Sequence, residues 1–464
     1  AGVRQASADR RSRQARGARI ARQAIGRRTP HVARARIPDH RRVVTPERGG
    51  VKELLAVSWE MPPLTGPRAT QVARTMVALA DLGWRSRTVC FDPRSTRYQQ
   101  DGDVSVEQAS EGRATLIPVR SPEEWLGVRV LWRLVPPLKH FPDEKRVWIP
   151  GALRAARRAL ATTPVDALVT FAQPWSDHLI GLCVKREQGL PWVAHFSDPW
   201  VDSPYQRQGS TIARRAAAWE RAIIQEADRV VFVNTYTRDR VMAKYPGAWH
   251  SKCAVVPQGH DGVVQSGAAS ARLGAPLRIV YTGRFYDGLR TPDAFLRALA
   301  TVHHEQSLAN RISVTFVGAA MDTYAVLADR LGVSQLVTFT GRVSPRAALQ
   351  EAASANVLLV IDSAATDGPS LFLPSKLIDY LPLRRPIIGV TPAQGPTGDL
   401  LRELNYPVIR PGDEAGLAAL LRTLGSNPAH LVLSPRHDSV ASRYHIAKTT
   451  AQFAAVLDDA CAGR

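Results

Sequence analysis

Short apolar segments that alternate with amphipathic helical patterns constrain the fold of this chain more than any other feature. Buried parallel strands read as short apolar runs, and helices show apolar residues three or four positions apart. Strand-like segments occupy residues 52–58, 87–91, 167–171, 192–196, 229–233, 253–256, 277–281, 313–317, 337–339, 357–361 and 386–390. Strands that alternate with helices form parallel sheets covered on both faces. The sequence therefore predicts an α/β fold with two doubly wound domains that face a cleft.

The domain boundaries follow from changes in composition along the 464 residues. A segment rich in Ser, Gly and Ala follows Asp261 and reads as the linker between two domains. We expect one Rossmann-like domain over residues 49–265 and a second over residues 270–440. Residues 441–464 are expected to form a C-terminal helix that packs back towards the first domain.

The net charge of +20 is concentrated at the N-terminus. Residues 1–48 contain 14 Arg against three acids, a net of +11. This segment has almost no large apolar residues, so it cannot offset its chain entropy, and we expect a basic disordered tail. Attraction to anionic lipid and a passive solvated tail both stay open. The tail has no aromatic residue to stack on bases, so no nucleic-acid partner is expected.

The cysteines and the hydropathy pattern indicate the compartment. The four cysteines form no CxxC pair, which argues against a zinc site and against a secreted disulfide framework. No apolar run approaches the roughly 20 residues that span a bilayer, and no signal peptide is recognisable. We expect a cytoplasmic protein. Trp125, Trp132 and Trp148 alternate with arginines and suit contact with the inner face of a membrane, although a half-buried helix pair is the alternative.

Two arginines flank the end of the strand at 277–281. Arg284 follows Gly283 directly, and Arg290 lies six residues further on. Fixed positive charges at a strand end can hold a diphosphate, since ligands of such sheets bind beyond the carboxyl ends of the strands. Two solvated surface arginines are the alternative.

A second group of candidates follows the strand at 357–361. Gly368 and Ser370 lie in a loop, and Pro374 suits the first turn of a helix. Lys376 and Asp379 are three residues apart and are expected to share one helical face. A carboxylate here could accept both hydroxyls of a ribose; an ordinary surface salt bridge is the alternative.

These segments resemble the retaining GT-B glycosyltransferases of family 4, also called glycosyl transferase group 1, from about residue 51 to residue 457. The motifs that carry the resemblance are Pro62-Pro63 with Gly66 and Arg68, Phe196-Ser197-Asp198-Pro199-Trp200, 226–234, 257–261, Gly283-Arg284 with Arg290, and 374–380 followed by 385–388. The resemblance implies the GT-B fold, with the first domain binding the acceptor and the second binding a nucleotide-sugar donor. It further implies a hexosyltransferase that needs no metal and no cofactor.

The resemblance also assigns residue roles. The donor would contact Gly283, Arg284, Arg290, Gly368, Ser370, Leu371, Lys376 and Asp379. Asp379 would hold the ribose. Leu371 stands where the family has a glutamate, and we expect backbone amides of residues 368–371 to take its place. The donor is expected to be a UDP- or GDP-sugar.

On the acceptor side the expected residues are Gly66, Arg68, Ser197 and Trp200. Asp198 is the expected base or orienting group, and with His195 and Arg284 it completes the expected catalytic set. Strand alternation puts His195 on the same side as Ser197, so it reaches the cleft only if the strand ends early; a core histidine is the alternative.

The sequence leaves the acceptor and the reaction partly open. The acceptor is an envelope polysaccharide, a lipid-linked glycan or a small molecule. A sugar-nucleotide epimerase, a pseudo-glycosyl coupling enzyme and an inactive nucleotide-binding scaffold stay open as alternatives.

Overall fold

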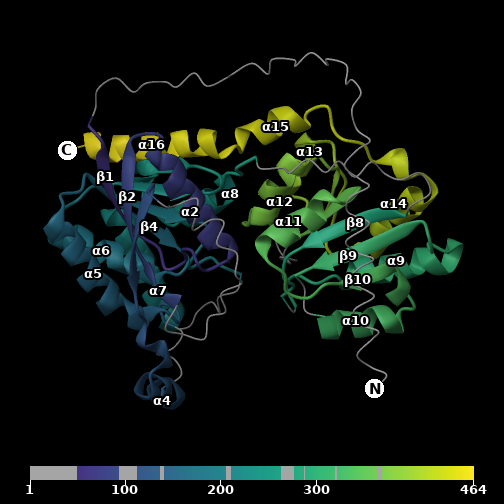
Figure 1. Cartoon of the computed structure of the whole chain (residues 1–464), viewed down its shortest axis with the longest axis horizontal. Coiled ribbons are helices and arrows are strands. Elements are labelled where there is room, and N and C mark those ends of the chain that lie inside the picture. The colour runs from purple at the N-terminus through teal and green to yellow at the C-terminus, as the bar shows by residue number, and fades with distance from the viewer. Residues whose placement is uncertain are drawn as a thin grey trace, which may run out of the picture. The chain divides into compact units, whose positions relative to one another are not determined.

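The computed structural model describes residues 50–93, 112–135, 141–204, 211–262, 276–286, 288–318, 321–362 and 368–463. The predicted tail at 1–48 and nearly all of the predicted linker lie outside these ranges. The described chain forms two parallel sheets with helices on their faces, as the α/β pattern predicts (Figure 1).

The first sheet has seven strands in the order β3-β2-β1-β4-β5-β6-β7. All pairings between neighbours are parallel. The strands are β1 (Lys52–Val57), β2 (Trp84–Phe91), β3 (Ala114–Val119), β4 (Ala167–Ala172), β5 (Trp192–Phe196), β6 (Arg229–Phe232) and β7 (Cys253–Val255). Its helices are α2 (Pro67–Ala80), α4 (Leu126–Leu134), α5 (Ile149–Thr162), α6 (Ser176–Gln188), α7 (Thr211–Glu226) and α8 (Thr235–Met242).

The second sheet has six strands in the order β10-β9-β8-β11-β12-β13. The strands are β8 (Leu277–Thr282), β9 (Ile312–Val317), β10 (Val337–Phe339), β11 (Val357–Ile361), β12 (Ile387–Val390) and β13 (Val408–Ile409). The helices are α9 (Asp293–Gln306), α10 (Met321–Arg330), α11 (Pro345–Ala353), α12 (Ser375–Tyr380), α13 (Pro396–Glu403), α14 (Glu414–Ser426) and α15 (His437–Arg443). Short 3₁₀ turns are η2 (Pro122–Glu124), η4 (Arg146–Trp148), η5 (Gly247–Lys252), η6 (Ser334–Leu336), η7 (Leu381–Leu383) and η8 (Pro428–His430).

Each sheet reverses its strand order once, between β1 and β4 and between β8 and β11. Open parallel sheets bind ligands beyond the carboxyl ends of the strands at such a reversal, because the loops on either side diverge there. The topology therefore places the candidate site at the ends of β1, β4, β8 and β11.

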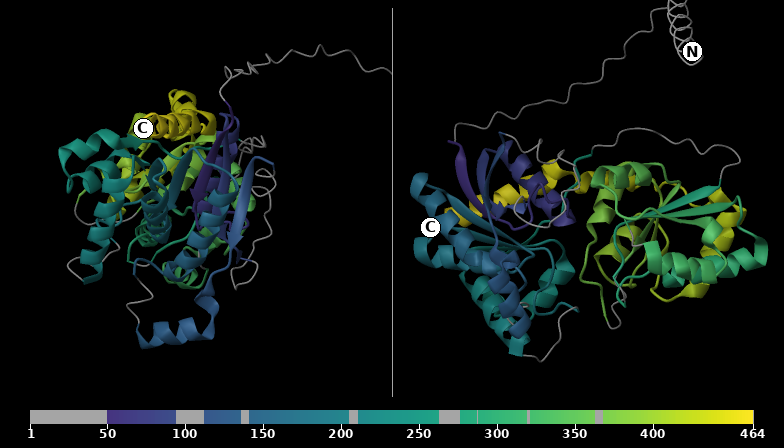
Figure 2. Two further views of the ribbon diagram at one scale, coloured as in Figure 1. Left: turned by 90° about the vertical axis from the view of Figure 1, so that its left-hand side faces the viewer. Right: turned by 60° about the horizontal axis from the view of Figure 1, so that its bottom comes forward.

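The last helix, α16 (Ile446–Ala462), belongs to the core of the first sheet (Figure 1). Phe453 and Leu457 are buried with Val72 of α2 in one apolar cluster. The connection between the sheets is tight at Gly259, where an added Cβ would lie 2.8 Å from the Cα of Ile446. Backbone N–H groups pair across this crossing, from His260 to the carbonyl of Tyr444 and from Ile446 to the carbonyl of His260. Figure 2 shows the same helix from two other sides.

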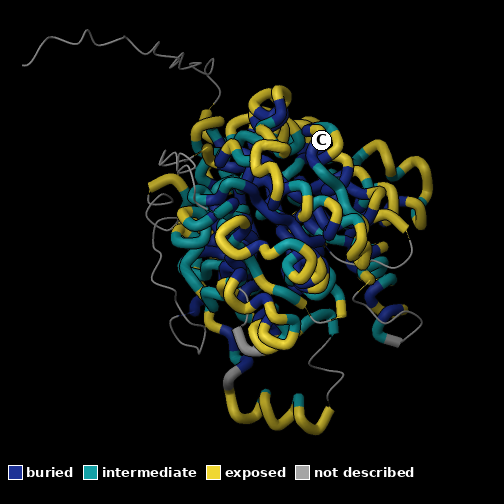
Figure 3. The backbone as a smooth tube through the Cα atoms, turned by 90° about the vertical axis from the view of Figure 1, so that its right-hand side faces the viewer, coloured by how far each residue is buried: buried dark blue, intermediate teal, exposed yellow. Residues whose placement is uncertain are grey.

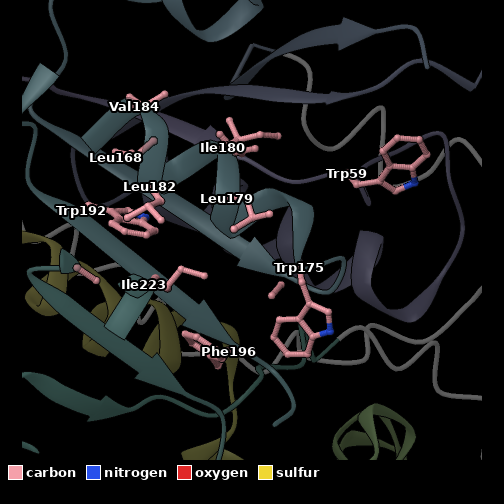
Figure 4. Packing of buried hydrophobic residues seen from close by; sticks show 14 of the residues in the cluster. Trp59, Leu168, Trp175, Leu179, Ile180, Leu182, Val184, Trp192, Phe196 and Ile223 are labelled. Atoms are coloured by element: carbon pink, nitrogen blue, oxygen red, sulfur yellow. The ribbon is translucent and has the colours of Figure 1, made fainter. Parts of the chain in front are cut away.

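The sheets are buried on both faces, and their strands form the interior of the described chain (Figure 3). Trp59 stacks on Phe91 with ring centroids 4.1 Å apart, and Trp148 meets Trp59 edge-on at 5.2 Å. Figure 4 shows α6 residues of the same apolar cluster, such as Leu182, beside Leu168 of β4 and Trp192 of β5. Trp148 is fully buried, so the expectation that it contacts a membrane is wrong; Trp125 is exposed instead.

Candidate active site

A cavity of about 960 Å³ lies where the topology predicts a site. The first sheet contributes Glu60, Arg68 and Asp198 to its lining. The second sheet contributes Arg290 and the start of α12 at Ser375. The cavity is therefore shared by loops of both sheets.

Arg68 crosses the carboxyl ends of β4 and β5. It is the second residue of α2, whose first residue is Pro67 and whose N-cap is Gly66. The guanidinium donates to the carbonyl of Ala172 and lies 3.2 Å from Nδ1 of His195. Burial lowers the pKa of Arg68 to about 10, while nearby carboxylates, Asp198 first, oppose this fall. Arg68 is thus a cation at neutral pH and fixes positive charge beside Asp198.

His195 lies behind Arg68. It is 8% exposed and packs between Phe171 and Phe453. It lines a small separate cavity of about 30 Å³. Burial, followed by the charge of Arg68, holds the pKa of His195 well below its usual value, so the ring is neutral.

Asp198 and its neighbours form one wall of the large cavity. Its Oδ2 accepts a hydrogen bond from Ser197 Oγ at 3.2 Å and one from Gln173 Nε2 at 3.4 Å. Burial raises the pKa of Asp198, and Arg68 counters that rise. Trp200 stacks flat on Trp175 at 5.0 Å and supports the same wall.

Three further carboxylates near this wall were not predicted from the sequence. Glu60 and Asp143 line the cavity. Asp177 is fully buried; its Oδ2 accepts from the backbone N–H of Trp59, and its Oδ1 has no hydrogen-bond partner in the part of the chain that the structure describes. Burial raises the pKa of all three. Asp177 lies in the first turn of α6, just before an apolar stretch of that helix. A carboxylate at such a position could have been predicted from the sequence to belong to a site.

Lys376 and Arg290 bring two cations to the second sheet's side of the site. Lys376 Nζ is buried 3.7 Å above the ring of Tyr281 and has no hydrogen-bond partner among the described residues. Gly283 permits this approach: its φ is +116°, and an added Cβ would lie 2.5 Å from Lys376 Nζ. Arg290 Nη2 lies 3.7 Å from Asp362 Oδ1, and Arg290 Nε is buried with no hydrogen-bond partner within the described ranges.

The positive charge of Lys376 and Arg290 is only partly balanced by the neighbouring carboxylate of Asp362. Burial and then the charge of Arg290 hold the pKa of Lys376 well below its usual value, and Asp362 opposes this only in part. Asp362, which follows β11 directly, accepts from Ser370 Oγ at 2.8 Å and from Thr391 Oγ1 at 3.2 Å. Ser370 is fully buried against Asp362. An anion would satisfy both cations.

The other residues that were expected to bind the nucleotide-sugar donor lie outside this cluster of charges. Arg284 is exposed and is absent from the described lining of the cavity. Gly368 is exposed with φ +111°. The carbonyl of Leu371 accepts from Asn234 Nδ2 at 3.1 Å and from Thr237 Oγ1 at 2.6 Å, so this loop contacts the first sheet's α8.

Asp379 lies between the sheets with 29% of its side chain exposed. Its Oδ1 accepts from Arg74 Nη1 at 2.7 Å, and Arg74 Nε lies 3.1 Å from Asp261 Oδ2. Lys376 is buried against Tyr281, so the two α12 residues contact different partners.

Within the ranges that the structure describes, no three His, Cys, Asp or Glu side chains are grouped so as to hold a metal ion. Within the same ranges, no helix is both long and apolar enough to cross a membrane.

Two doubly wound sheets that share a cavity at their strand ends define the GT-B class of glycosyltransferases, and the described chain has this fold. Residues 66–259 match the family described as Glycosyl transferase 4-like domain. Over these residues the chain is similar to the family that the sequence motifs indicate, and the solved structures below share its fold.

Solved structures agree with this fold at low sequence identity. Sucrose-phosphate synthase from Thermosynechococcus elongatus is 17% identical, over 89% of this chain and 100% of that chain, with a TM-score of 0.62. A UDP-forming α,α-trehalose-phosphate synthase from Burkholderia vietnamiensis is 13% identical, over 90% and 100%, with a TM-score of 0.59. A TarM variant from S. aureus, solved with UDP, is 10% identical, over 88% and 99%, with a TM-score of 0.59. A search of curated proteins finds no match.

Proposed function

We propose that this chain transfers a hexose, with retention, from a UDP- or GDP-sugar to an acceptor held by the first sheet. The observation that carries the proposal is the pair Lys376 and Arg290, each with a buried nitrogen to which no described residue forms a hydrogen bond. A buried donor without a partner costs about 1–3 kcal/mol, more when it is charged. A ligand that brings two negative charges removes this cost, and a nucleoside diphosphate does so.

Lys376 and Arg290 would also accelerate the sugar transfer. As the bond from the sugar to the diphosphate breaks, negative charge develops on the leaving oxygen. Preorganised cations in a site from which water is excluded stabilise this charge more in the transition state than in the ground state. Lys376 and Arg290 are half-buried and are held by Tyr281 and Asp362, so they need little reorganisation. No metal or cofactor is required by this proposal.

Asp379 is the proposed ribose ligand. It lies on α12 three residues after Lys376, and its carboxylate is partly exposed. Arg74 engages its Oδ1 and would yield to the ribose hydroxyls when a nucleotide binds. Asp379 therefore links nucleotide binding to the contact between the sheets.

On the acceptor side we propose Asp198 as the group that orients the attacking hydroxyl or accepts its proton. It lines the cavity, and Arg68 keeps positive charge beside it. The expected acceptors are an envelope polysaccharide, a lipid-linked glycan or a small molecule, and the proposed place of action is the cytoplasm, at the inner face of a membrane. The similarity to a UDP-forming trehalose-phosphate synthase and to a TarM structure with bound UDP favours a UDP-sugar.

The test is a thermal-shift screen with UDP-, GDP-, ADP- and TDP-sugars, followed by product analysis. A ligand that binds only the folded state raises the melting temperature, so one base is expected to stabilise the protein selectively. Turnover of the donor with and without acceptor glycans then separates transfer from epimerisation. Stabilisation by no nucleotide sugar at concentrations up to millimolar would refute the proposal.

A further inference from the structure

Helix α4 (Leu126–Leu134) stands away from the other helices of the first sheet (Figures 1 to 3). None of its residues is buried. Trp125, which caps it, is 70% exposed, and Leu126 and Leu134 are 76% and 74% exposed. Large apolar side chains exposed together, rather than singly, mark an interaction surface.

The outward face of α4 has a defined chemical order. Residues four apart in a helix lie on one face, so Leu126, Val130 and Leu134 form a single stripe. Arg129 and Arg133, also four apart, flank this stripe. Val128 and Trp132 are only partly exposed and lie on the opposite side. An apolar stripe bordered by arginines is the pattern of a helix that lies in the plane of a membrane interface.

A groove of about 1050 Å³ continues from this helix along β3 and α5. Trp125, Ile117 and Val147 are among its apolar lining residues. Arg120, Arg154 and Arg158 line it as well, and all three are exposed.

Arg157 and Lys145 nearby are paired with Glu187 and Glu123. Among the described residues, no ion pair is found for the five arginines on α4 and along the groove. The nine residues of α4 include no acid. Glu123, two residues before Trp125, is paired with Lys145. The surface therefore carries a local excess of positive charge, complementary to phosphate.

We propose that α4 and the adjacent groove dock onto an anionic lipid surface. Leu126, Val130 and Leu134 enter the boundary of the acyl chains, Trp125 lies at the headgroup level, and the arginines contact lipid phosphates. A second copy of the chain fits this surface poorly, because a twofold pairing of two α4 stripes would gather the arginines of both copies in one interface, and α4 has no acid to pair with them. The inference is independent of the proposed sugar transfer.

The test is flotation of the full chain with vesicles of phosphatidylcholine alone or with 30% phosphatidylglycerol (on the order of the anionic content of cytoplasmic leaflets). Leu126→Ser with Leu134→Ser is expected to reduce binding to the anionic vesicles by about tenfold or more. Arg129→Ser with Arg133→Ser is expected to reduce it by about 30-fold, since each of the two arginines near an anionic surface adds roughly 1 kcal/mol. Both pairs are exposed, so the melting temperature is expected to stay unchanged.

The matched control is Val326→Ser with Val432→Ser, which removes exposed apolar side chains from the second sheet's half. It is expected to bind vesicles like the parent chain. All variants keep residues 1–48, so binding by that basic segment contributes equally to each. Vesicle binding that is the same for the α4 variants and the parent chain would overturn the inference, as would loss of self-association without loss of vesicle binding in sedimentation experiments. Stabilisation by nucleotide sugars, measured in parallel, reports on the proposed function separately.

Discussion

Arg74 of α2 donates to Asp379 of α12 at 2.7 Å and so joins the helices of the two sheets. The same guanidinium lies 3.1 Å from Asp261, at the connection that follows β7. Burial lowers the pKa of Arg74, but the two carboxylates overcome this effect, and its pKa is raised. One cation thus holds both the proposed ribose ligand and the chain between the sheets.

Removing Arg74 is expected to strengthen nucleotide binding. In Arg74→Met, Asp379 no longer has to leave an ion pair before it can bind the ribose. The affinity for UDP or GDP should therefore rise by roughly threefold, which corresponds to the free energy of a partly exposed ion pair. Affinity for inorganic pyrophosphate should not change, because pyrophosphate has no ribose. Calorimetry measures both, with Arg240→Met as the control for loss of an exposed surface arginine. An equal gain for pyrophosphate would contradict the role of Asp379.

Removing Lys376 is expected to weaken binding of the diphosphate. Lys376→Met should lower the affinity for UDP or GDP by about 1.5–3 kcal/mol, as for a hydrogen bond to a charged group. The sequence alone predicts the same loss for Arg284→Ala, whereas the exposed position of Arg284 predicts a smaller one. Calorimetry on both variants decides which residue contacts the phosphates, and a larger loss for Arg284→Ala would reassign the site.

Asp198→Asn separates binding from chemistry. If Asp198 accepts the proton of the acceptor hydroxyl, kcat should fall by about 100-fold or more, while nucleotide affinity stays within a factor of roughly two. Asp239→Asn, on the exposed face of α8, is the matched control. Initial rates with a working acceptor give the first quantity and calorimetry the second. A kcat within a few-fold of the parent value would limit Asp198 to a positioning role.

Acid should destabilise the protein through His178. This ring is fully buried in α6, and its Nδ1 lies 2.7 Å from Thr170 Oγ1. Burial lowers its pKa to about 3. The folded state therefore binds this proton less readily than the unfolded state, whose histidine titrates near its usual value, and stability falls as the pH falls from about 6.5 towards 3. Urea unfolding across this range should show a shallower fall for His178→Leu; equal slopes would exclude His178 as the cause.

Gly259→Ala should loosen the C-terminal helix. An added Cβ would lie 2.4 Å from Thr449 Oγ1 and 2.8 Å from the Ile446 Cα, and the backbone cannot give way cheaply. The expected loss of stability is roughly 1–3 kcal/mol, the usual size of overpacking. Gly247→Ala, where nothing lies within 4 Å, is the control. Thermal unfolding compares the melting temperatures of the two variants. If both substitutions change the melting temperature equally, the cause is the entropy of the unfolded chain and not crowding at Gly259.

The periodicity of the sequence predicted most strands, because buried parallel strands are uniformly apolar. β3 was missed, since its residues are only half buried and include Pro118, so its pattern is that of an edge strand. The helix start at Asn234 became clear only in the structure, where its side chain accepts from the Thr237 N–H.

The candidate site was less predictable, since it depends on which side chains meet across the sheets. Gly283 and Lys376 were named from sequence motifs, but their mutual approach needs the backbone. Arg74 reads as an ordinary residue on the polar face of α2, and no spacing rule links it to Asp379, 305 positions away. Asp362 could have been predicted from the sequence as a site residue, because it is a carboxylate directly after an apolar strand.

The return of α16 to the first sheet means that the N-terminal half is not a contiguous piece of sequence. A fragment ending at the linker would expose Val72, Met76 and Phe171, which Phe453 and Leu457 otherwise cover. Such a fragment should aggregate when expressed alone and should become soluble when residues 441–464 are supplied as a separate peptide or grafted after Gly262. Evolutionary exchange of donor halves between such enzymes would accordingly have to preserve the last helix along with the first sheet.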